Sequence, residues 1–449
     1  MESRFEEREK ARSAEIGTIV GSRFDLPFLR LKSRRTQTIL DQLIVSGSNF
    51  ATGIVLVRGL GLTEFGKFTV GYAIVLLANS VQLSFISSPM LTLGSLCATP
   101  EDRQKFVRGV YGIQLIFCVL ATLLSGISAA VYLFFHPSVI PVSFVPAFTA
   151  AVVFYLMQDW LRRYYFTIGK AETAVWNDVI SYIGQLILLC IIWWMRLLTV
   201  ETAFWTIAIT SGIAFAVGAL TERLASTRTE TRESWHQTRG ISVDLGVANQ
   251  LQWLVYQGAI LIGASVVGAQ AAGGVRATQN VIGPVNVAFQ AMENIVPLRA
   301  GEEMRKGGIQ RAAKFLFRFG SIGFFTLLVV FLIASTFSDK FLALFYGHQL
   351  REYSSVLNLQ MLYFLLAWPV RQLTFLFRTI KKTSPILMSS VVAAIISMLL
   401  IYPLVRRFDA LGIVIAAVAG QVGNLLYLVV AWVRVSSTFK PESLETQTT

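Results

Sequence analysis

The chain has 449 residues, of which 54% are hydrophobic and 14% are charged, and its formal net charge is +13. A soluble domain carries about 25% charged residues, so this composition excludes an ordinary soluble protein and indicates a chain whose solvent is lipid. The three cysteines and three histidines are scattered, which argues against a disulfide framework and a metal site.

Taken in order, the chain begins with a charged stretch and continues with twelve apolar ones. Each apolar stretch is close to the ~20 residues that cross a bilayer core. The predicted spans are 36–57, 68–94, 109–135, 139–161, 175–195, 202–220, 247–268, 275–298, 314–336, 354–379, 383–404 and 411–433. We therefore expect an all-α integral membrane protein with about 12 transmembrane helices in two six-helix, pseudo-symmetric bundles around a central cavity.

The longest polar gap divides the chain into two halves. The expected divisions are a cytoplasmic tail at 1–35, a bundle at 36–220, a cytoplasmic linker at 221–245, a second bundle at 246–434 and a cytoplasmic tail at 435–449. Lys and Arg alternate between the two sides, with 30 on the side of the termini, 8 on the other and Arg371 inside a span. The positive-inside rule therefore predicts that both termini are cytoplasmic, and the alternation argues against a nucleic-acid partner.

A repeat at a shift of 208 positions links the two halves. It aligns residue types that are rare inside spans, namely Gln42 with Gln250, Asn49 with Gln257, Gly66 with Gly274, Gln82 with Gln290 and Pro89 with Pro297. Since six spans return the chain to its starting side, the halves are expected to be parallel repeats.

The repeated amides are the first candidate site. Gln42 and Asn49 lie seven residues apart on one helical face, and Gln250 and Gln257 repeat that spacing. Such stripes, with Gln82 and Gln290, could donate hydrogen bonds to sugar hydroxyls along a cavity wall. The alternative is hydrogen bonding between helices, which contributes about 0.6 kcal/mol per bond in membranes.

Arg371 is the second candidate, because a charge inside a span costs about 2.5–3.5 kcal/mol on insertion scales and usually faces a cavity. Its planar guanidinium suits bidentate binding of a diphosphate, although a long side chain could also reach the headgroups. Arg162 and Arg163 are expected nearer the surface, as topology signals.

Intramembrane acids are the third candidate, since they mark proton relays in transporters. Glu293 could carry a coupling proton or pair with Arg371, and Asp159 is a second coupling candidate. A static ion pair or a position at the interface explains either acid equally well. The sequence contains no Ser/His/Asp set and no phosphate-binding Gly-x-x-x-x-Gly-Lys-Ser/Thr loop, so we predict neither a catalytic site nor a cofactor.

Three stretches carry a family resemblance that covers roughly residues 36–434. Asp41-Gln-Leu-Ile-Val-Ser-Gly-Ser-Asn-Phe50 with Arg58-Gly-Leu-Gly-Leu-Thr-Glu-Phe-Gly-Lys-Phe68 resembles the first hairpin of polysaccharide transporters, and Gln158-Asp-Trp-Leu-Arg-Arg163 resembles the end of their fourth span. These are the Wzx-type lipid-linked oligosaccharide flippases of the multidrug/oligosaccharidyl-lipid/polysaccharide exporter superfamily. The second half departs most, because it keeps Asn249-Gln250 but has no counterpart of Asn49-Phe50.

The resemblance implies two six-helix lobes around a cavity that opens alternately to each side of a prokaryotic inner membrane. It implies transport of a polyprenyl-diphosphate-linked oligosaccharide from the inner to the outer leaflet for cell-surface polysaccharide synthesis. The expected partners are the lipid-linked glycan, membrane lipids, a polysaccharide polymerase and other assembly proteins. The alternatives are a multidrug/cation antiporter of the same superfamily and, with less support, a membrane glycosyltransferase or ligase.

Overall fold

A computed structural model describes residues 34–94, 97, 99–135, 141–380, 382 and 384–438 of the chain. Most of the two predicted tails therefore lies outside the described residues. The described part of the chain is helical, with no strand, as the sequence predicts. Eight of its helical stretches are long and apolar enough to cross a membrane by length and composition.

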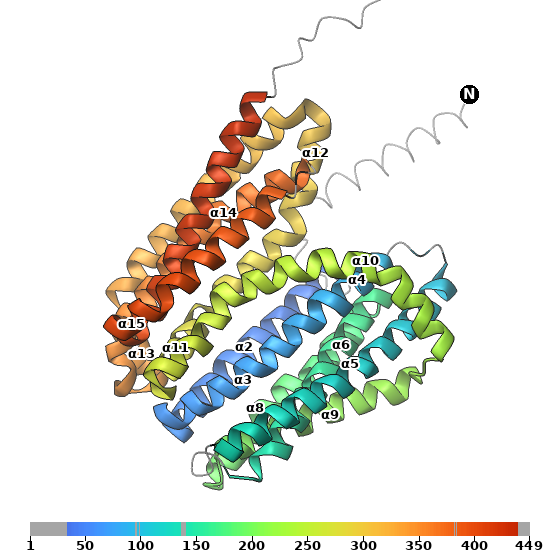
Figure 1. Cartoon of the computed structure of the whole chain (residues 1–449), viewed down its shortest axis with the longest axis vertical. Helices are drawn as coiled ribbons and strands as arrows, with labels where there is room; N and C mark the ends of the chain where they lie inside the picture. Colours follow the sequence, from blue (N-terminus) through green and yellow to red (C-terminus); the bar gives the residue numbers. More distant parts are fainter. Residues whose placement is uncertain are drawn as a thin grey trace, which may run out of the picture.

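The first six predicted spans form an N-terminal lobe (Figure 1). Its elements are α2 (Arg34–Leu60), α3 (Leu62–Gln82), the π-helical turn η1 (Leu83–Ser87), α4 (Ser88–Gly94), α5 (Pro100–Phe135), α6 (Phe144–Ile168), α7 (Ala171–Asp178), the π-helical turn η2 (Val179–Ile183), α8 (Gly184–Trp194) and α9 (Val200–Glu222). The fourth span differs most from its predicted bounds, because α6 begins at Phe144 and runs to Ile168, where Gly169 adopts the left-handed conformation that ends the helix.

The remaining helices form a C-terminal lobe. Its elements are α11 (Ala259–Val267), α12 (Ala269–Thr336), α13 (Ser338–Tyr346), the short η4 (His348–Tyr353), α14 (Ser354–Thr379) and α15 (Ser384–Thr438). The two longest helices each contain two predicted spans. Between the two spans the backbone departs from helical geometry, at Gly307–Gly308 in α12 and at Asp409 in α15. In the described residues the twelve predicted spans thus fall largely on helical stretches, and residues 141–143 of the fourth span precede its helix.

The polar stretch predicted as a linker is largely helical. After α9, helix α10 (Arg228–Trp253) begins at Thr227, whose hydroxyl accepts from the Glu230 amide while the Glu230 carboxylate accepts from the Thr227 amide. This reciprocal pair is a capping box, which satisfies two free amides at the helix start. A π-helical turn, η3 (Leu254–Gly258), then joins α10 to α11.

Helix α10 connects the lobes by packing on both of them. Its first half packs on α5, where Gly109 and Gly112 leave room for the backbone and side chains of Glu230, Thr231 and Ser234. Beyond η3, α11 packs on α15 in the other lobe. Figure 1 shows α10 running along the N-terminal lobe toward α11.

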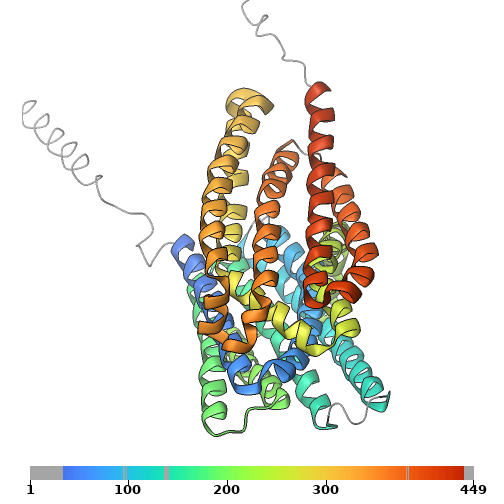
Figure 2. The same ribbon diagram turned by 90° about the vertical axis from the view of Figure 1, so that its left-hand side faces the viewer.

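The lobes meet at the end of the bundle that contains the α2–α3 turn, here called the turn end. Gly66 in α3 lies against the backbone of Ala269 at the start of α12, and Gly273 lies against Leu62 and Gly66. Arg58 donates to the carbonyl oxygen of Phe345 in α13 (2.9 Å). From this end the two lobes diverge toward the end where α2 begins and α15 ends, here called the terminal end (Figures 1 and 2).

The outer surface of the bundle is apolar, as a lipid-facing surface should be. Side chains on α5 such as Leu123, Leu124 and Ile127 are 54–67% exposed, and Phe325 and Ile333 on α12 are similarly exposed. Exposed apolar surface of this extent is stable only against lipid or a partner. Because the outside is apolar, polar side chains in the interior are the natural place to look for function.

Candidate functional site

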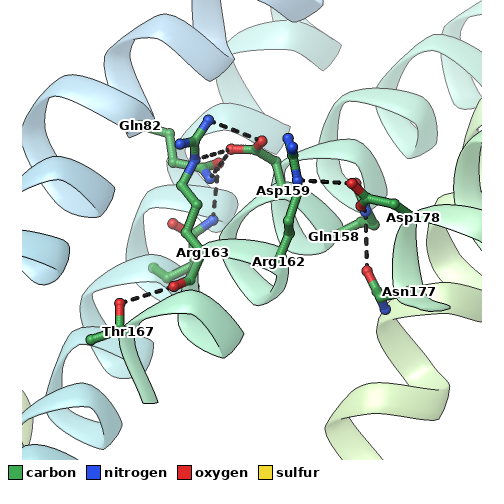
Figure 3. Close-up of polar contacts among 9 residues, drawn as sticks. Gln82, Gln158, Asp159, Arg162, Arg163, Thr167, Asn177 and Asp178 are labelled. Atoms are coloured by element: carbon green, nitrogen blue, oxygen red, sulfur yellow. Dashed lines mark hydrogen bonds and ion pairs between the residues drawn. The ribbon is translucent and has the colours of Figure 1, made fainter. Parts of the chain in front are cut away.

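A cluster of charged side chains lies inside the N-terminal lobe. In α6, Asp159 pairs with Arg163 one turn later (2.9 Å), and Arg162 pairs with Asp178 at the end of α7 (2.8 Å). Asp178 is completely buried, while Asp159 and Arg162 are 3% and 8% exposed. Figure 3 shows the two pairs side by side across the lobe.

Amide side chains complete the shell around both acids. Gln82 donates to Asp159 (3.4 Å) and accepts from Gln114 (3.3 Å). On the other side, Gln158 donates to both Asn177 (3.0 Å) and Asp178 (2.9 Å). Each buried acid therefore has an arginine and an amide as partners, which is what makes a buried carboxylate tolerable in a low dielectric.

The position of the two arginines corrects one expectation from the sequence. Arg162 and Arg163 do not lie at the surface, because Arg162 is buried and Arg163 has 22% of its side chain exposed. The i, i+4 spacing of Asp159 and Arg163 was visible in the sequence, but the partner of Arg162 lies on another helix. Asp159 therefore pairs within its own helix, with Arg163.

Two π-helical turns flank this cluster. The turn η1 begins directly after Gln82, and η2 begins directly after Asp178. A π-helical turn inserts an extra residue into an α-helix and leaves backbone groups without their usual partners, and such turns concentrate at functional sites. The cluster thus lies where α3 and the α7–α8 helix both deviate from regular geometry.

The amide stripe of the first span lies on the face of α2 that turns toward α12. Gly53 on this face contacts Asn280 of α12. One turn closer to the terminal end, Asn49 is exposed, and two turns further Gln42 is half-buried. The stripe therefore begins where the lobes are in contact and continues where they diverge.

Of the corresponding residues of the seventh span, Gln250 lies close to the second span. Gln250 in α10 donates to Ser80 (3.0 Å) in α3 and to Ser84 (3.3 Å) in η1. Gln257 is half-buried within η3. Of the predicted cavity amides, Gln82 is completely buried inside the lobe, and the Gln290 side chain lies outside the described residues.

Arg371 lies half-buried on α14 among aromatic rings. Its guanidinium is 5.1 Å from the ring centre of Phe289 in α12, a cation–π contact. Trp368 packs against the same ring and donates to the carbonyl oxygen of Gly320 (2.8 Å). The side chain of Glu293, which the sequence offers as a partner for Arg371, lies outside the described residues.

Arg276 is a candidate that the sequence did not reveal, because it lies at the edge of the predicted span 275–298, where a cation needs no partner. It lies half-buried in α12, 5.5 Å from the ring centre of Tyr72 in α3, and donates to Gln279 (3.3 Å). Because Tyr72 belongs to the N-terminal lobe and Arg276 to the C-terminal lobe, this cation lies between the two lobes. Within the described residues, no group of His, Cys, Asp or Glu side chains could hold a metal ion.

The fold is similar to that of known membrane transporters. The structure of the lipid II flippase MurJ in an inward closed conformation matches with a TM-score of 0.70 and 12% identity, over 89% of this chain and 87% of that chain. A MATE protein in complex with MaL6 matches with a TM-score of 0.63 and 16% identity, over 90% and 95% of the two chains. A MOP-superfamily transporter from Pyrococcus furiosus matches with a TM-score of 0.62 and 16% identity, over 90% and 94%.

At these identities the likeness establishes the twelve-helix, two-lobe fold and nothing finer. No protein-family model matches the chain, and no curated protein sequence does.

Proposed function

We propose that this chain is a transporter that moves a polyprenyl-diphosphate-linked oligosaccharide from the inner to the outer leaflet by alternating access, without catalysing a reaction. In this proposal it spans a prokaryotic inner membrane with both termini in the cytoplasm. The glycan then serves cell-surface polysaccharide synthesis, with a polysaccharide polymerase and other assembly proteins as partners.

The distribution of guanidinium groups in the interior is the observation that carries the proposal. Within the described residues, both buried acids, Asp159 and Asp178, pair with arginines, so neither offers a free carboxylate to a cationic substrate. Arg276 and Arg371 add two half-buried guanidinium groups, and an anion can bind such groups strongly where water is scarce. A lipid-linked diphosphate supplies such an anion, and the guanidinium of Arg371 can bind it through two parallel hydrogen bonds.

The amides of the first and seventh spans provide the second part of the proposed recognition. Sugar hydroxyls both donate and accept hydrogen bonds, as do the side-chain amides of Gln42, Asn49, Gln250 and Gln257. Gln82 and Gln290 are proposed to join them when the lobes rearrange. In the present arrangement the contact between the lobes at the turn end would make substrate enter from the terminal end.

Coupling to an ion is proposed through Asp159 or Glu293. For Asp159 a coupling proton would have to compete with the Arg163 guanidinium, so protonation and release of that pair would occur together. The similarity to MurJ, a protein described as a lipid II flippase, supports a lipid-linked substrate.

A multidrug/cation antiporter is the second candidate, because several of the matched folds are MATE transporters. Such a protein would need a carboxylate free to meet a cationic substrate. Among the described residues, the pairing of both buried acids with arginines counts against it.

Transport by the purified, full-length chain in vesicles separates the two candidates. A fluorescent polyprenyl-diphosphate disaccharide is incorporated in both leaflets of the vesicles. A membrane-impermeant lectin binds the molecules in the outer leaflet, so the unbound fraction measures those in the inner leaflet over time. We expect protein-dependent movement of this lipid and none of ethidium. Movement of ethidium alone would replace the flippase with the antiporter.

A further inference from the structure

The first half of α10 carries a stripe of basic and aromatic side chains that the transport proposal does not use. Arg228, Arg232, Trp235 and Arg239 recur at steps of three and four residues, which places them on one side of the helix. All four are exposed, with Trp235 at 49%. We call these four residues the basic stripe.

The basic stripe is distinct from the face by which α10 packs on the N-terminal lobe. Thr231, Ser234 and Thr238 form the packing face, and Ser234 donates to the carbonyl oxygen of Phe106 in α5 (3.0 Å). Ser234 and Thr238 are 2% and 3% exposed. The packing contacts therefore leave the stripe open to its surroundings.

The two acids in the first half of the same helix do not neutralise the stripe. Glu230 is engaged in the capping box with Thr227, and Glu233 pairs with Lys105 of α5 (3.1 Å). In the part of the chain that the structure describes, none of the three stripe arginines forms an ion pair. Three cations thus stand together, while the two acids beside them have partners elsewhere.

Helix stability does not explain the arginines either. The start of a helix carries a partial positive charge, so cations in the first turns are unfavourable. Arg228 is the first residue of α10 and Arg232 follows one turn later. An external anion near these residues would relieve both the mutual repulsion and the unfavourable position.

We propose that the basic stripe binds the headgroups of anionic phospholipids in the leaflet at the terminal end. The helix continues through η3 and α11 into the bundle, so its first half lies where polar sequence gives way to membrane span. Trp is the residue that favours this headgroup level, and juxtamembrane Lys and Arg attract anionic lipids. Binding there would hold the start of α10, and with it the connection between the lobes, at the membrane surface.

Lipid binding by the full-length, delipidated protein tests the proposal. The protein is titrated with phosphatidylglycerol and separately with phosphatidylcholine, and bound lipids are counted by native mass spectrometry. We expect a preference for phosphatidylglycerol that weakens with added salt. Each Arg→Gln substitution in the stripe should reduce that affinity about fivefold, and R228K/R232K/R239K should retain it.

The matched control is R406Q/R407Q, which removes two cations that stack on Tyr402 and Phe408 away from α10. Amide hydrogen exchange in nanodiscs locates the bound lipid. Phosphatidylglycerol should slow exchange in residues 223–239 of the wild type, and it should not slow exchange there in R228Q/R232Q/R239Q. If the triple variant does not accumulate, the single variants carry the same test. An unchanged lipid preference in the stripe variants, or an equal loss in the control, would overturn the proposal and favour an acidic protein partner.

Discussion

The side chain of Arg58 donates to the main-chain carbonyl oxygen of Phe345 across 287 positions of sequence, and so joins the two lobes. Arg58 stands in the last turn of α2, and Phe345 in the last turn of α13. The carbonyls at a helix end are unsatisfied and carry partial negative charge, so a guanidinium there is favourable. The contact stabilises the arrangement in which the turn end is closed.

Arg58→Ala should therefore open the turn end more often. A charge-assisted hydrogen bond at an exposed site contributes about 1 kcal/mol, which corresponds to roughly fivefold in the population of the open state. Spin labels on Thr63 and Gln349, which line a crevice between the lobes at this end, report the distance. Arg406→Ala is the control, and an unchanged distance distribution in Arg58→Ala would show that the contact does not hold the lobes.

Gly66→Ala tests the close approach of α3 and α12. A Cβ atom at Gly66 would overlap the carbonyl group of Ala269, a main-chain group that cannot move aside without moving the helix. Overpacking of this kind costs about 1–3 kcal/mol, so the variant should disfavour the closed turn end. Gly47→Ala is the matched control because a Cβ there meets nothing within 4 Å. The spin labels on Thr63 and Gln349 measure the distance between the lobes in both variants. Equal distance distributions in Gly66→Ala and Gly47→Ala would contradict the close approach of α3 and α12.

The helices were largely predictable from the sequence, whereas the charged cluster was not. Hydrophobic stretches of span length identify helices because the membrane demands them, and residues 354–379 coincide with α14. The helical linker was less accessible to this reasoning, because the signal there is the capping box of Thr227 and Glu230 rather than hydropathy. A span search does not register such a signal.

The two arginines of α6 show why the charged cluster could not be predicted from the sequence. Arg162 stands near the end of a hydrophobic stretch, where the positive-inside rule explains a cation without any partner. Only the tertiary structure brings Asp178 to within 2.8 Å of it. Arg276 was missed for the same reason, since its contact with Tyr72 joins two lobes whose relative position no local pattern specifies.

Asp178→Asn should destabilise the protein strongly. The substitution leaves the buried Arg162 without its counter-charge, and breaking one partner of a buried pair costs about 3–5 kcal/mol. Thermal unfolding in detergent measures the effect. Lys105→Gln, which breaks an exposed pair with Glu233, should change stability by less than about 1 kcal/mol. Equal stability of the two variants would mean that Arg162 finds another partner or water in the lobe.

Cysteines on one face of α2 should distinguish the open and closed parts of the interface. Asn49 is exposed, while Leu56, seven residues further on the same face, is 1% exposed. If this face lines a polar cavity, Asn49→Cys should react with a small hydrophilic thiol reagent and Leu56→Cys should not. Protection of both cysteines would assign Asn49 to lipid or packing and would remove the amide stripe from the proposed site.

Arg371 is the residue on which the proposed substrate class depends most directly. If its guanidinium binds a diphosphate, Arg371→Lys keeps the charge but loses the planar pair of donors, so transport should fall without loss of protein. Arg371→Ala removes a charge-assisted contact that contributes about 1.5–3 kcal/mol, and transport should fall roughly ten- to a hundredfold. Arg378→Ala, two turns further along α14 and exposed, is the control and should transport normally.

Three outcomes separate the roles open to Arg371. Reduced transport at normal protein level in both variants, with Ala below Lys, supports diphosphate binding, since packing alone does not require a guanidinium. Loss of accumulation in Arg371→Ala indicates a structural role, in which the cation–π contact with Phe289 and its neighbours holds α14 on α12. Normal transport by Arg371→Ala would mean that the side chain reaches toward the headgroups, and Arg276 would then be the next residue to test for binding of an anionic substrate.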